Sequence, residues 1–428
     1  MKQMHLRICV FLAAATGIIQ GQTLRSLADA RGIHFGAAVT FPASPAVYDT
    51  TLARQFNGLV CEDAMKFENI MTGPTTFNYT GADAIVNFGV ARGMYVRGHT
   101  FIWHKQAPTW FMNLNVSRDS AFKIMKYYIT TEMTHFKGKI REWDIVNEAV
   151  ARDSSGMRLG SGYADTTQNA KWAALTDAAN HNFDYIDSAF AYARRADSTV
   201  LLFYNDYNCE GMGRKSNLVY NLVSRLKSLN LVDGIGLQCH FHLLNETAVN
   251  GAWVPSEITT NLQRLAALGL IISFTEVDIR IPALHTPLNA ADSANLIEQR
   301  SEYYTLMNLF LSQPACKSFF TWGVNDSQSW IPDVFTGYGA PLLFYDTRGT
   351  NGEFVPKMAY YGVRDALTAT GVVPQAPNGV LRTVPAAEPF NQTHDLLGRK
   401  LNWLPCNPRR FVVKPGVIEL EQQRRHDR

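Results

Sequence analysis

The chain has 428 residues, of which 46% are hydrophobic and 18% are charged, and its formal net charge is +3. A chain of this length and composition can bury a large core, and it leaves room for a single barrel of about 250 residues or more followed by a tail. So small a net charge gives no electrostatic reason to expect nucleic acid or an anionic membrane as a partner.

The first residues have the pattern of a secretory signal peptide. Lys2 and Arg7 precede or flank the start of an apolar run over residues 8–19, and Gly21 follows that run. We therefore expect residues 1–21 to be a signal peptide and the protein to be secreted, either extracellular or periplasmic. The run is too short to span a bilayer, and no later segment approaches about twenty uninterrupted apolar residues, so no transmembrane segment is expected.

Eight short β-rich segments recur along the chain, and most are followed by a longer segment of helical period. This alternation is typical of repeated βα units around a parallel sheet. No GxGxxG turn follows the first strand, so eight units favour a (β/α)₈ TIM barrel over a doubly wound sheet. The expected strands are 33–39, 58–61, 95–99, 143–147, 200–205, 234–238, 270–275 and 319–322, and the expected helices include 121–136, 174–195, 217–229 and 291–311.

The composition changes after about residue 370, where proline and small residues become frequent. We expect a catalytic domain over residues 22–370, a linker over 371–390 and a short basic C-terminal tail or small appended module over 391–428. The stretch 394–400 (HDLLGRK), with Lys414-Pro415-Gly416 after it, resembles the C-terminal sorting or attachment domains of some secreted bacterial enzymes. A basic tail without a fold is the alternative.

The six cysteines form no metal-binding or disulfide-rich pattern. None has CxxC spacing, and the five outside the predicted signal peptide are odd in number. This argues against a zinc site and against a dense disulfide framework, although one or two bridges stay open. His99, His104 and His240 also match no usual zinc spacing, so we expect no metal and no cofactor.

Polar and aromatic residues stand where the expected strands end, which in a (β/α)₈ barrel is the edge that carries the active site. Carboxyl, imidazole, amide and indole groups gathered there indicate a polar cleft with aromatic walls. The residues are Glu62, Lys66, His99, Trp103, His104, Gln106, Asn147, Glu148, Asn205, Gln238, His240, Glu276, Asp278 and Trp322.

Two of these residues, Glu148 and Glu276, are carboxylates at the ends of different strands. If both strands belong to one barrel, the two side chains face a common mouth. Cleavage of a glycosidic bond requires such a pair, one acid to protonate the leaving oxygen and one carboxylate on the other side of the sugar. Carboxyl groups about 5–5.5 Å apart leave no room for an attacking water, so the second carboxylate attacks directly and configuration is retained.

Five motifs in the same order resemble those of the xylanases of glycoside hydrolase family 10, over about residues 24–368. The segment VRGHTFIWH at 96–104 is similar to the family's strand-three motif, and WDIVNEA at 143–149 is similar to its acid/base signature. The motif TEVD at 275–278 carries the residue that resembles the family's nucleophile. The remaining matches are 203–208, 234–240 and 275–278, and the residues around the eighth strand at 322–330 and 341–344 complete the pattern.

The resemblance implies a retaining endo-1,4-β-xylanase that cleaves internal bonds of xylan, with Glu148 as acid/base and Glu276 as nucleophile. The second carboxylate is expected to raise the pKa of Glu148 so that it stays protonated. His240 and Asn147 are expected to donate hydrogen bonds that keep Glu276 ionised, and Asp278 is expected to orient His240.

The resemblance also implies the sugar-binding residues. Most are expected to hold the sugar on the non-reducing side of the cleavage point, with Trp322 and Trp330 closing over it. The expected partner is xylan or a xylo-oligosaccharide, the expected state is a monomer, and the tail is a candidate for attachment to a cell surface or complex. The binding set is Glu62, Lys66, His99, Trp103, Gln106, Asn205, Gln238, Trp322 and Trp330.

Departures from the family pattern and other interpretations bear on these expectations. Asp63 stands where the family usually has Asn, which replaces a donor and acceptor by an acceptor alone, and Phe67 replaces a usual Trp. Lys66 has a structural interpretation as an ion pair with Glu62. The alternatives for the whole chain are a related retaining β-1,4-glucanase or mannanase, or a binding protein that has lost catalysis.

Overall fold

The computed structural model describes residues 22–40, 46–162, 165–176, 183–243, 253–286 and 288–369, and the backbone of 393–394 and 400–401. The chain divides into two compact units, residues 1–378 and 379–428. The predicted signal peptide, the predicted linker and most of the predicted tail lie outside the described residues. In the second unit, β13 (Thr393–His394) and β14 (Lys400–Leu401) pair antiparallel.

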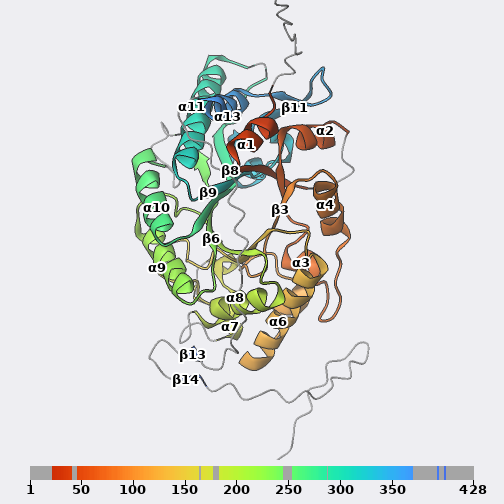
Figure 1. Ribbon diagram of the computed structural model, residues 1–428, viewed down its shortest axis with the longest axis vertical. Coiled ribbons are helices and arrows are strands. Elements are labelled where there is room, and N and C mark those ends of the chain that lie inside the picture. The colour runs from red at the N-terminus through yellow and green to blue at the C-terminus, as the bar shows by residue number, and fades with distance from the viewer. Residues whose placement is uncertain are drawn as a thin grey trace, which may run out of the picture. The chain divides into compact units, whose positions relative to one another are not determined.

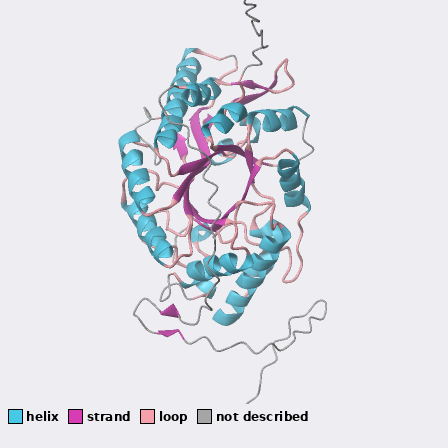
Figure 2. Cartoon of the chain, viewed as in Figure 1, coloured by secondary structure: helices cyan, strands magenta, loops and turns pink. Residues whose placement is uncertain are grey.

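Eight strands of the first unit close into a parallel barrel (Figures 1 and 2). Closure comes from the last of them, which pairs with both the first strand and its predecessor in the barrel. The predicted strands agree with the observed ones to within a residue or two, apart from the last two. The strands are β1 (His34–Val39), β2 (Gly58–Cys61), β3 (Tyr95–Gly98), β4 (Glu142–Asn147), β5 (Leu201–Asp206), β6 (Gly234–Leu237), β8 (Ile271–Pro282) and β9 (Cys316–Thr321).

Strand β8 is longer than predicted because its second half has partners outside the barrel. The short strand β7 (His240–His242) runs parallel to it, with His240 opposite Asp278. On the other side, β10 (Tyr338–Gly339) pairs antiparallel with its last two residues. The extension therefore places β7 beside residues 278–280, which follow Glu276. A separate hairpin joins β11 (Phe344–Arg348) to β12 (Phe354–Pro356).

Helices surround the barrel (Figure 2). Caps explain where several begin: the Ser117 hydroxyl accepts the Ser120 N–H at the start of α6, and Asn289 forms a capping box with Asp292 at the start of α11. The helices are α1 (Leu24–Arg31), α2 (Ala46–Gln55), α3 (Phe67–Ile70), α4 (Thr80–Ala91), α5 (Thr109–Met112), α6 (Arg118–His135), α7 (Lys171–Leu175), α8 (Asp184–Ala196), α9 (Arg214–Ser228), α10 (Pro255–Ala267), α11 (Ala290–Ser312), α12 (Ile331–Val334) and α13 (Met358–Thr368).

The prediction of one helix over 174–195 is wrong, because two helices occupy this stretch. Helix α7 ends at Leu175, and the Thr176 hydroxyl bonds back to the Trp172 carbonyl. Helix α8 begins at Asp184, with acidic side chains in its first turn that suit the positive end of a helix dipole. None of the helices in the described residues is long and apolar enough to cross a membrane.

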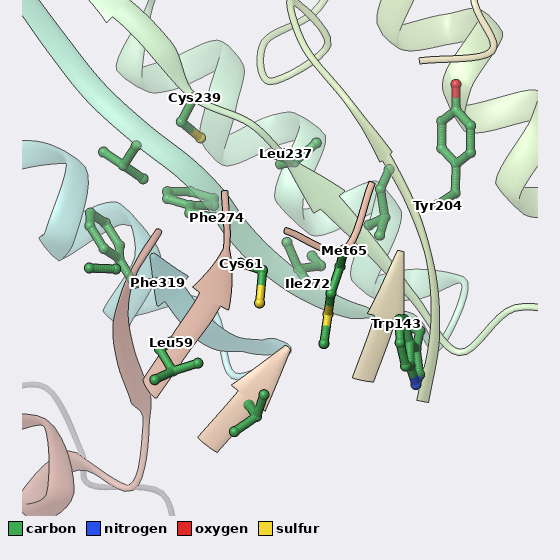
Figure 3. Close-up of a cluster of buried hydrophobic side chains, with 14 of the residues drawn as sticks. Leu59, Cys61, Met65, Trp143, Tyr204, Leu237, Cys239, Ile272, Phe274 and Phe319 are labelled. Carbon is green, nitrogen blue, oxygen red and sulfur yellow. The ribbon is translucent and has the colours of Figure 1, made fainter. Parts of the chain in front are cut away.

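The main core lies between the barrel wall and the helices, and Figure 3 shows part of it, including Leu59, Trp143 and Phe319. A second, smaller cluster contains Phe320 and Trp322 with Ala38 and Val60. Two glycines make room for the Phe320 ring. A Cβ at Gly36 would lie 2.3 Å from it and one at Gly58 would lie 2.9 Å from it.

The cysteines among the described residues are buried thiols. Cys61, Cys209, Cys239 and Cys316 are all free, so no disulfide forms within the described part of the chain. Burial raises the pKa of each thiol, which keeps it protonated and unreactive.

A buried ion network joins β3 to β4 inside the barrel. The Arg97 guanidinium pairs with Glu142 and with both oxygens of Asp144, and all three side chains are almost fully buried. Burial raises the pKa of Asp144, but the Arg97 charge and the His99 ring outweigh burial and lower it. Asp144 in turn lies 3.0 Å from Nδ1 of His99. The network thus extends to a side chain of the candidate site.

Arg97→Met should destabilise the fold strongly, because it leaves two buried carboxylates without their cation. Removing one partner of a buried pair typically costs about 3–5 kcal/mol. Urea unfolding measures the change. Arg118→Met is the matched control, since Arg118 pairs with Asp184 at the surface and loss of such a pair should cost at most about 1 kcal/mol. Equal losses in the two variants would contradict the prediction.

Candidate active site

The predicted site residues gather at the carboxyl ends of the barrel strands. Two strands are irregular close to the residue that carries a carboxylate. Strand β4, which precedes Glu148, shifts register against β5 between Asp144 and Val146, and β8, which contains Glu276, shifts against β9 between Phe274 and Val277. Such bulges redirect side chains. Glu148 follows β4 directly with φ of 57°, a conformation that costs energy for a residue with a side chain.

One amide, that of Asn205, connects the strands that carry the two carboxylates. Its Nδ2 donates to Glu276 Oε1 at 2.7 Å and to Asn147 Oδ1 at 2.9 Å. The Thr275 hydroxyl donates to its Oδ1 at 2.7 Å, which fixes which way the amide points. Gly236 leaves the necessary space, because a Cβ there would stand 2.1 Å from the same Oδ1. Asn205 is therefore held in one orientation.

The Glu148 carboxylate is held at one of its two oxygens. Oε1 accepts from Asn147 Nδ2 at 3.2 Å and from Gln238 Nε2 at 3.1 Å. The backbone around it is fixed as well: Arg158 donates to the Glu148 carbonyl at 3.1 Å, and the Tyr204 hydroxyl accepts the next two backbone N–H groups. Two amide donors therefore share Oε1.

The pKa of Glu148 is lowered to about 2. Burial raises it, but the charge of protonated His104, the nearby Trp103 indole, the Gln238 amide and the Lys215 charge outweigh burial. His104 carries that charge only in acid, because burial lowers its own pKa to about 3. The prediction that the second carboxylate raises the pKa of Glu148 is wrong for this structure, in which groups that favour the anion prevail.

The second carboxylate, Glu276, lies in a chain of paired groups. His240 Nε2 is 3.1 Å from Glu276 Oε2, and His240 Nδ1 is 2.8 Å from Asp278 Oδ2. The Trp330 indole donates to the same Asp278 oxygen at 2.9 Å. Asn147, predicted to support Glu276, instead bonds to Glu148, because Asn205 lies between it and Glu276.

His240 is a cation in this arrangement. Burial lowers its pKa, but Asp278 and then Glu276 outweigh burial and raise it to about 10. Both ring nitrogens therefore donate, one to each carboxylate. The imidazolium orients Glu276 and offsets the charge of the pair.

A further group of polar side chains follows β2 and β3. Lys66 pairs with Asp63 at 2.8 Å, and not with Glu62 as the structural interpretation of this residue would have it. Gln106 Nε2 donates to the same Asp63 oxygen at 3.0 Å, and this satisfies the acceptor that replaces the usual Asn. Glu62 accepts from the Thr40 hydroxyl at 2.6 Å, and its pKa is raised mainly by burial.

Aromatic rings stand over these polar groups. Lys66 Nζ lies 5.0 Å from the Trp103 ring centre and 6.0 Å from that of Trp322. The Trp322 ring meets His99 edge-on at 5.3 Å, and Trp330 meets His240 in the same way at 4.9 Å. These contacts bring predicted binding residues that follow β2, β3 and β9 together, and Trp322 and Trp330 also meet the His240 ring that bonds to Glu276.

Sequence reasoning missed three residues that shape the site, and it placed a fourth, His104, at the strand ends without assigning it a role there. Thr275 orients Asn205, Tyr204 and Arg158 fix the backbone around Glu148, and His104 faces the Glu148 carboxylate at 3.8 Å. Thr275 and Tyr204 lie within the matched motifs 275–278 and 203–208, which was a signal for them, whereas Arg158 lies ten residues beyond Glu148 in a loop. Within the described ranges, no group of three or more His, Cys, Asp or Glu side chains could hold a metal.

A (β/α)₈ barrel with two glutamates at the carboxyl ends of its strands, beside indole rings, is the arrangement of a glycoside hydrolase. The chain belongs to glycosyl hydrolase family 10, whose model matches residues 23–366.

Relatives and solved structures agree with this assignment. Endo-1,4-beta-xylanase B of Thermotoga neapolitana is 32% identical over 81% of this chain and 92% of its own length. Exoglucanase XynX of Acetivibrio thermocellus is a longer protein that is 34% identical to this chain. The match covers 73% of this chain and 26% of that relative. The crystal structure of xylanase 10B from Thermotoga petrophila in complex with xylobiose is 32% identical, with a TM-score of 0.70, and the match covers 82% of this chain and 98% of that one.

His240→Gln should destabilise the protein in a pH-dependent way. The folded pKa of about 10 lies above the ordinary value of 6.5, so the stabilisation by the proton is complete below pH 6.5 and is lost as pH rises through 10. The free energy of unfolding should differ between wild type and variant by a few kcal/mol at pH 6, and this difference should shrink toward pH 10. Urea titrations at several pH values measure it.

His285→Gln is the control, because His285 pairs with Asp292 from an exposed position (65% for its side chain) and should change stability little. A difference for His240→Gln that stays constant from pH 6 to pH 10 would show that the imidazolium does not contribute as described.

Proposed function

We propose that the chain is a retaining endo-1,4-β-xylanase that hydrolyses internal β-1,4-xylosidic bonds of xylan by double displacement. Its family and the xylanases among its relatives support this substrate. The observation that carries the mechanism is the link between the carboxylates, in which Asn147 joins Glu148 to Asn205 and Asn205 joins the pair to Glu276. Two acids held across one cleft are what glycoside cleavage needs.

In the first half of the reaction, Glu276 attacks the anomeric carbon while Glu148 protonates the departing oxygen. Two donors, Asn205 and His240, hold the oxygens of Glu276 and keep it aimed and ionised. This pre-organisation lowers the barrier because the groups need not reorient as charge moves. The products are a covalent glycosyl-enzyme and a shortened xylan chain.

Glu148 must gain its proton on Oε2 when the sugar binds. A bound sugar excludes water from the cleft, which strengthens the burial that already raises the pKa of Glu148. After the first step the ionised carboxylate accepts a proton from the attacking water. The donors on Oε1, Asn147 and Gln238, favour that ionised form. One residue thus serves as acid and then as base.

Two indole rings, Trp322 and Trp330, cover the sugar-binding side of the cleft. The other side chains that bind the sugar there are Glu62, Lys66, His99, Trp103 and Gln106. Xylose lacks the hydroxymethyl group of glucose, so indole rings close to the site exclude the larger sugar by steric clash. Asn205 and Gln238 contact the carboxylates and would bind sugar hydroxyls only alongside that role.

The purified protein should hydrolyse xylan much faster than carboxymethylcellulose, because of this clash. Release of reducing ends from both polymers measures it. Glu276→Ala should lose turnover by several orders of magnitude yet still bind xylo-oligosaccharides, which calorimetry measures. Negligible turnover by the wild-type protein would favour a binding protein instead.

One observation favours the β-1,4-glucanase alternative, namely the similarity of the chain to Exoglucanase XynX. The same pair of assays decides between the two, since a clear preference for carboxymethylcellulose would defeat the xylanase assignment.

Glu148→Ala should spare substrates with good leaving groups. Loss of a general acid costs about 10²–10⁴-fold on natural xylan, whereas aryl xylobiosides with acidic phenols need less protonation and should keep far more of their first-step rate. Initial rates and burst kinetics over a series of phenols measure this. Glu257→Ala, an exposed residue on α10, is the control. A uniform loss for every leaving group would contradict the role of Glu148.

A further inference from the structure

A buried ion pair that the mechanism above does not use anchors the loop that carries the two indoles of the cleft. Asp326 lies between Trp322 and Trp330 in the loop after β9. Its Oδ2 is 2.7 Å from Nζ of Lys357, the residue that precedes α13. The Lys357 side chain is fully buried, and the Asp326 side chain is 17% exposed. A buried ion pair adds little net stability compared with apolar residues of the same size, but in some proteins it fixes one arrangement of the chain.

Both charged groups also bind the short segment 340–342. Asp326 Oδ1 accepts the backbone N–H of Leu342 at 2.9 Å. Lys357 Nζ donates to the Ala340 carbonyl at 2.6 Å. Each oxygen of the carboxylate therefore has a partner, and Asp326 is fixed relative to both the start of α13 and this segment.

On one side, the chain after Asp326 leads to Trp330. The Asp326 carbonyl accepts the Ser329 N–H at 3.2 Å, which closes a turn just before the indole. The Trp330 indole then donates to Asp278 at 2.9 Å, and its ring meets Phe335 edge-on at 5.5 Å. Because the backbone of Trp330 is carried by this turn, a shift of Asp326 moves the ring relative to Asp278.

On the other side, the segment 340–342 packs against the residue that follows Trp322. The Leu342 side chain is fully buried, and a Cβ on Gly323 would lie 2.7 Å from it. Gly323 also has φ of 131°, in the region that favours glycine. Asp326, which binds the backbone of Leu342, therefore helps to fix the positions of both indoles.

Each charge of the pair depends on the other. Burial raises the pKa of Asp326, and the Lys357 charge opposes this rise. Burial lowers the pKa of Lys357, and the Asp326 charge opposes this fall. Removing one partner leaves an uncompensated buried charge, whereas removing both leaves none. The two residues therefore act as one unit.

We propose that Asp326 and Lys357 are positioning residues that hold the two indoles in place, and that they thereby set how strongly the cleft discriminates between xylose and glucose units. They act through Trp322 and Trp330. The inference rests on the proposed function, in which these rings exclude the hydroxymethyl group of glucose. Exclusion by steric clash works only while the excluding groups stay where they are.

The first test compares kcat/KM for an aryl xylobioside with kcat/KM for the matching aryl cellobioside. The proteins are the wild type, Asp326→Asn, Lys357→Met and the double variant. One methylene in a fitted pocket is worth about 10–200-fold, so we expect the ratio of the two values to fall by about tenfold in each variant. The double variant should lose no more than the single ones, because one unit is lost in all three.

A ratio that stays at the wild-type value in Asp326→Asn and in the double variant overturns the proposal. Effects that add in the double variant overturn it as well. The double variant buries no unpaired charge, so it keeps the test open if a single variant does not fold. Thermal unfolding shows which variants are folded.

Asp233→Asn is the matched control. The Asp233 carboxylate also accepts a backbone N–H, that of Leu202 at 3.0 Å, and also pairs with a cation, Arg194. It stands just before β6, at the end of the barrel opposite the indoles. Asp233→Asn should lower the thermal stability and leave the ratio unchanged. An equal fall of the ratio in this control would show that lost stability alone is responsible, which overturns the proposal.

The second test follows hydrogen exchange of the Trp330 indole N–H by nitrogen-15 NMR, with the signal assigned by its loss in Trp330→Phe. In Asp326→Asn the bond to Asp278 should open more often, and exchange should become about tenfold faster. The Trp110 indole is the internal control, because it donates to the Met71 carbonyl at 2.9 Å and should exchange at the wild-type rate. Unchanged exchange at Trp330 overturns the proposal.

The exchange measurement needs no substrate, so it separates this inference from the proposed function. If the wild-type protein hydrolyses neither glycoside, the proposed function fails. Calorimetry with xylobiose and cellobiose then supplies the ratio, now of binding constants, and the same fall in the variants is expected. A ratio of binding constants that is unchanged in Asp326→Asn and in the double variant overturns the inference as well.

Discussion

The amide of Asn205 is the contact on which the geometry of the site depends. It joins Glu276 of β8 to Asn147 of β4, and Asn147 in turn bonds to Glu148. The two acids are therefore spaced by short side chains at the ends of neighbouring strands, and not by flexible loops. Rigid strands place functional groups more accurately than loops do. The contact also requires glycine at position 236, because any larger residue there would collide with the Asn205 amide.

The proposed mechanism gives the two glutamates opposite tasks, and their surroundings differ in a way that suits those tasks. Glu276 lies against an imidazolium that a second carboxylate holds in place, so its charge is compensated. Glu148 has donors on one oxygen only, and it adopts a left-handed backbone conformation that the Tyr204 and Arg158 contacts impose. Strain and uneven bonding of this kind are typical of groups that change protonation during a reaction.

Most strand bounds, and the placement of Glu148 and Glu276 at one edge of the barrel, could be predicted from the sequence, because buried parallel strands have a clear apolar pattern and polar residues follow them. The partners of these residues could not. Asn147 and Asn205 have the same side chain and lie opposite each other, and the strand order decides which one reaches Glu276, because β5 lies nearer to β8 than β4 does. Lys66 pairs with Asp63, three residues away, and not with Glu62, which is four residues away. The pKa of Glu148 depends on His104 and Lys215, which lie on other elements.

The ring of Phe320 fills space that side chains at Gly36 and Gly58 would otherwise occupy. Three positions on three neighbouring strands thus share one volume inside the barrel. A methyl group added at either glycine and a smaller residue at 320 would each harm packing alone, and together they would offset one another. A survey of single replacements would therefore make this wall look less tolerant of change than it is, because the permitted exchanges come in pairs.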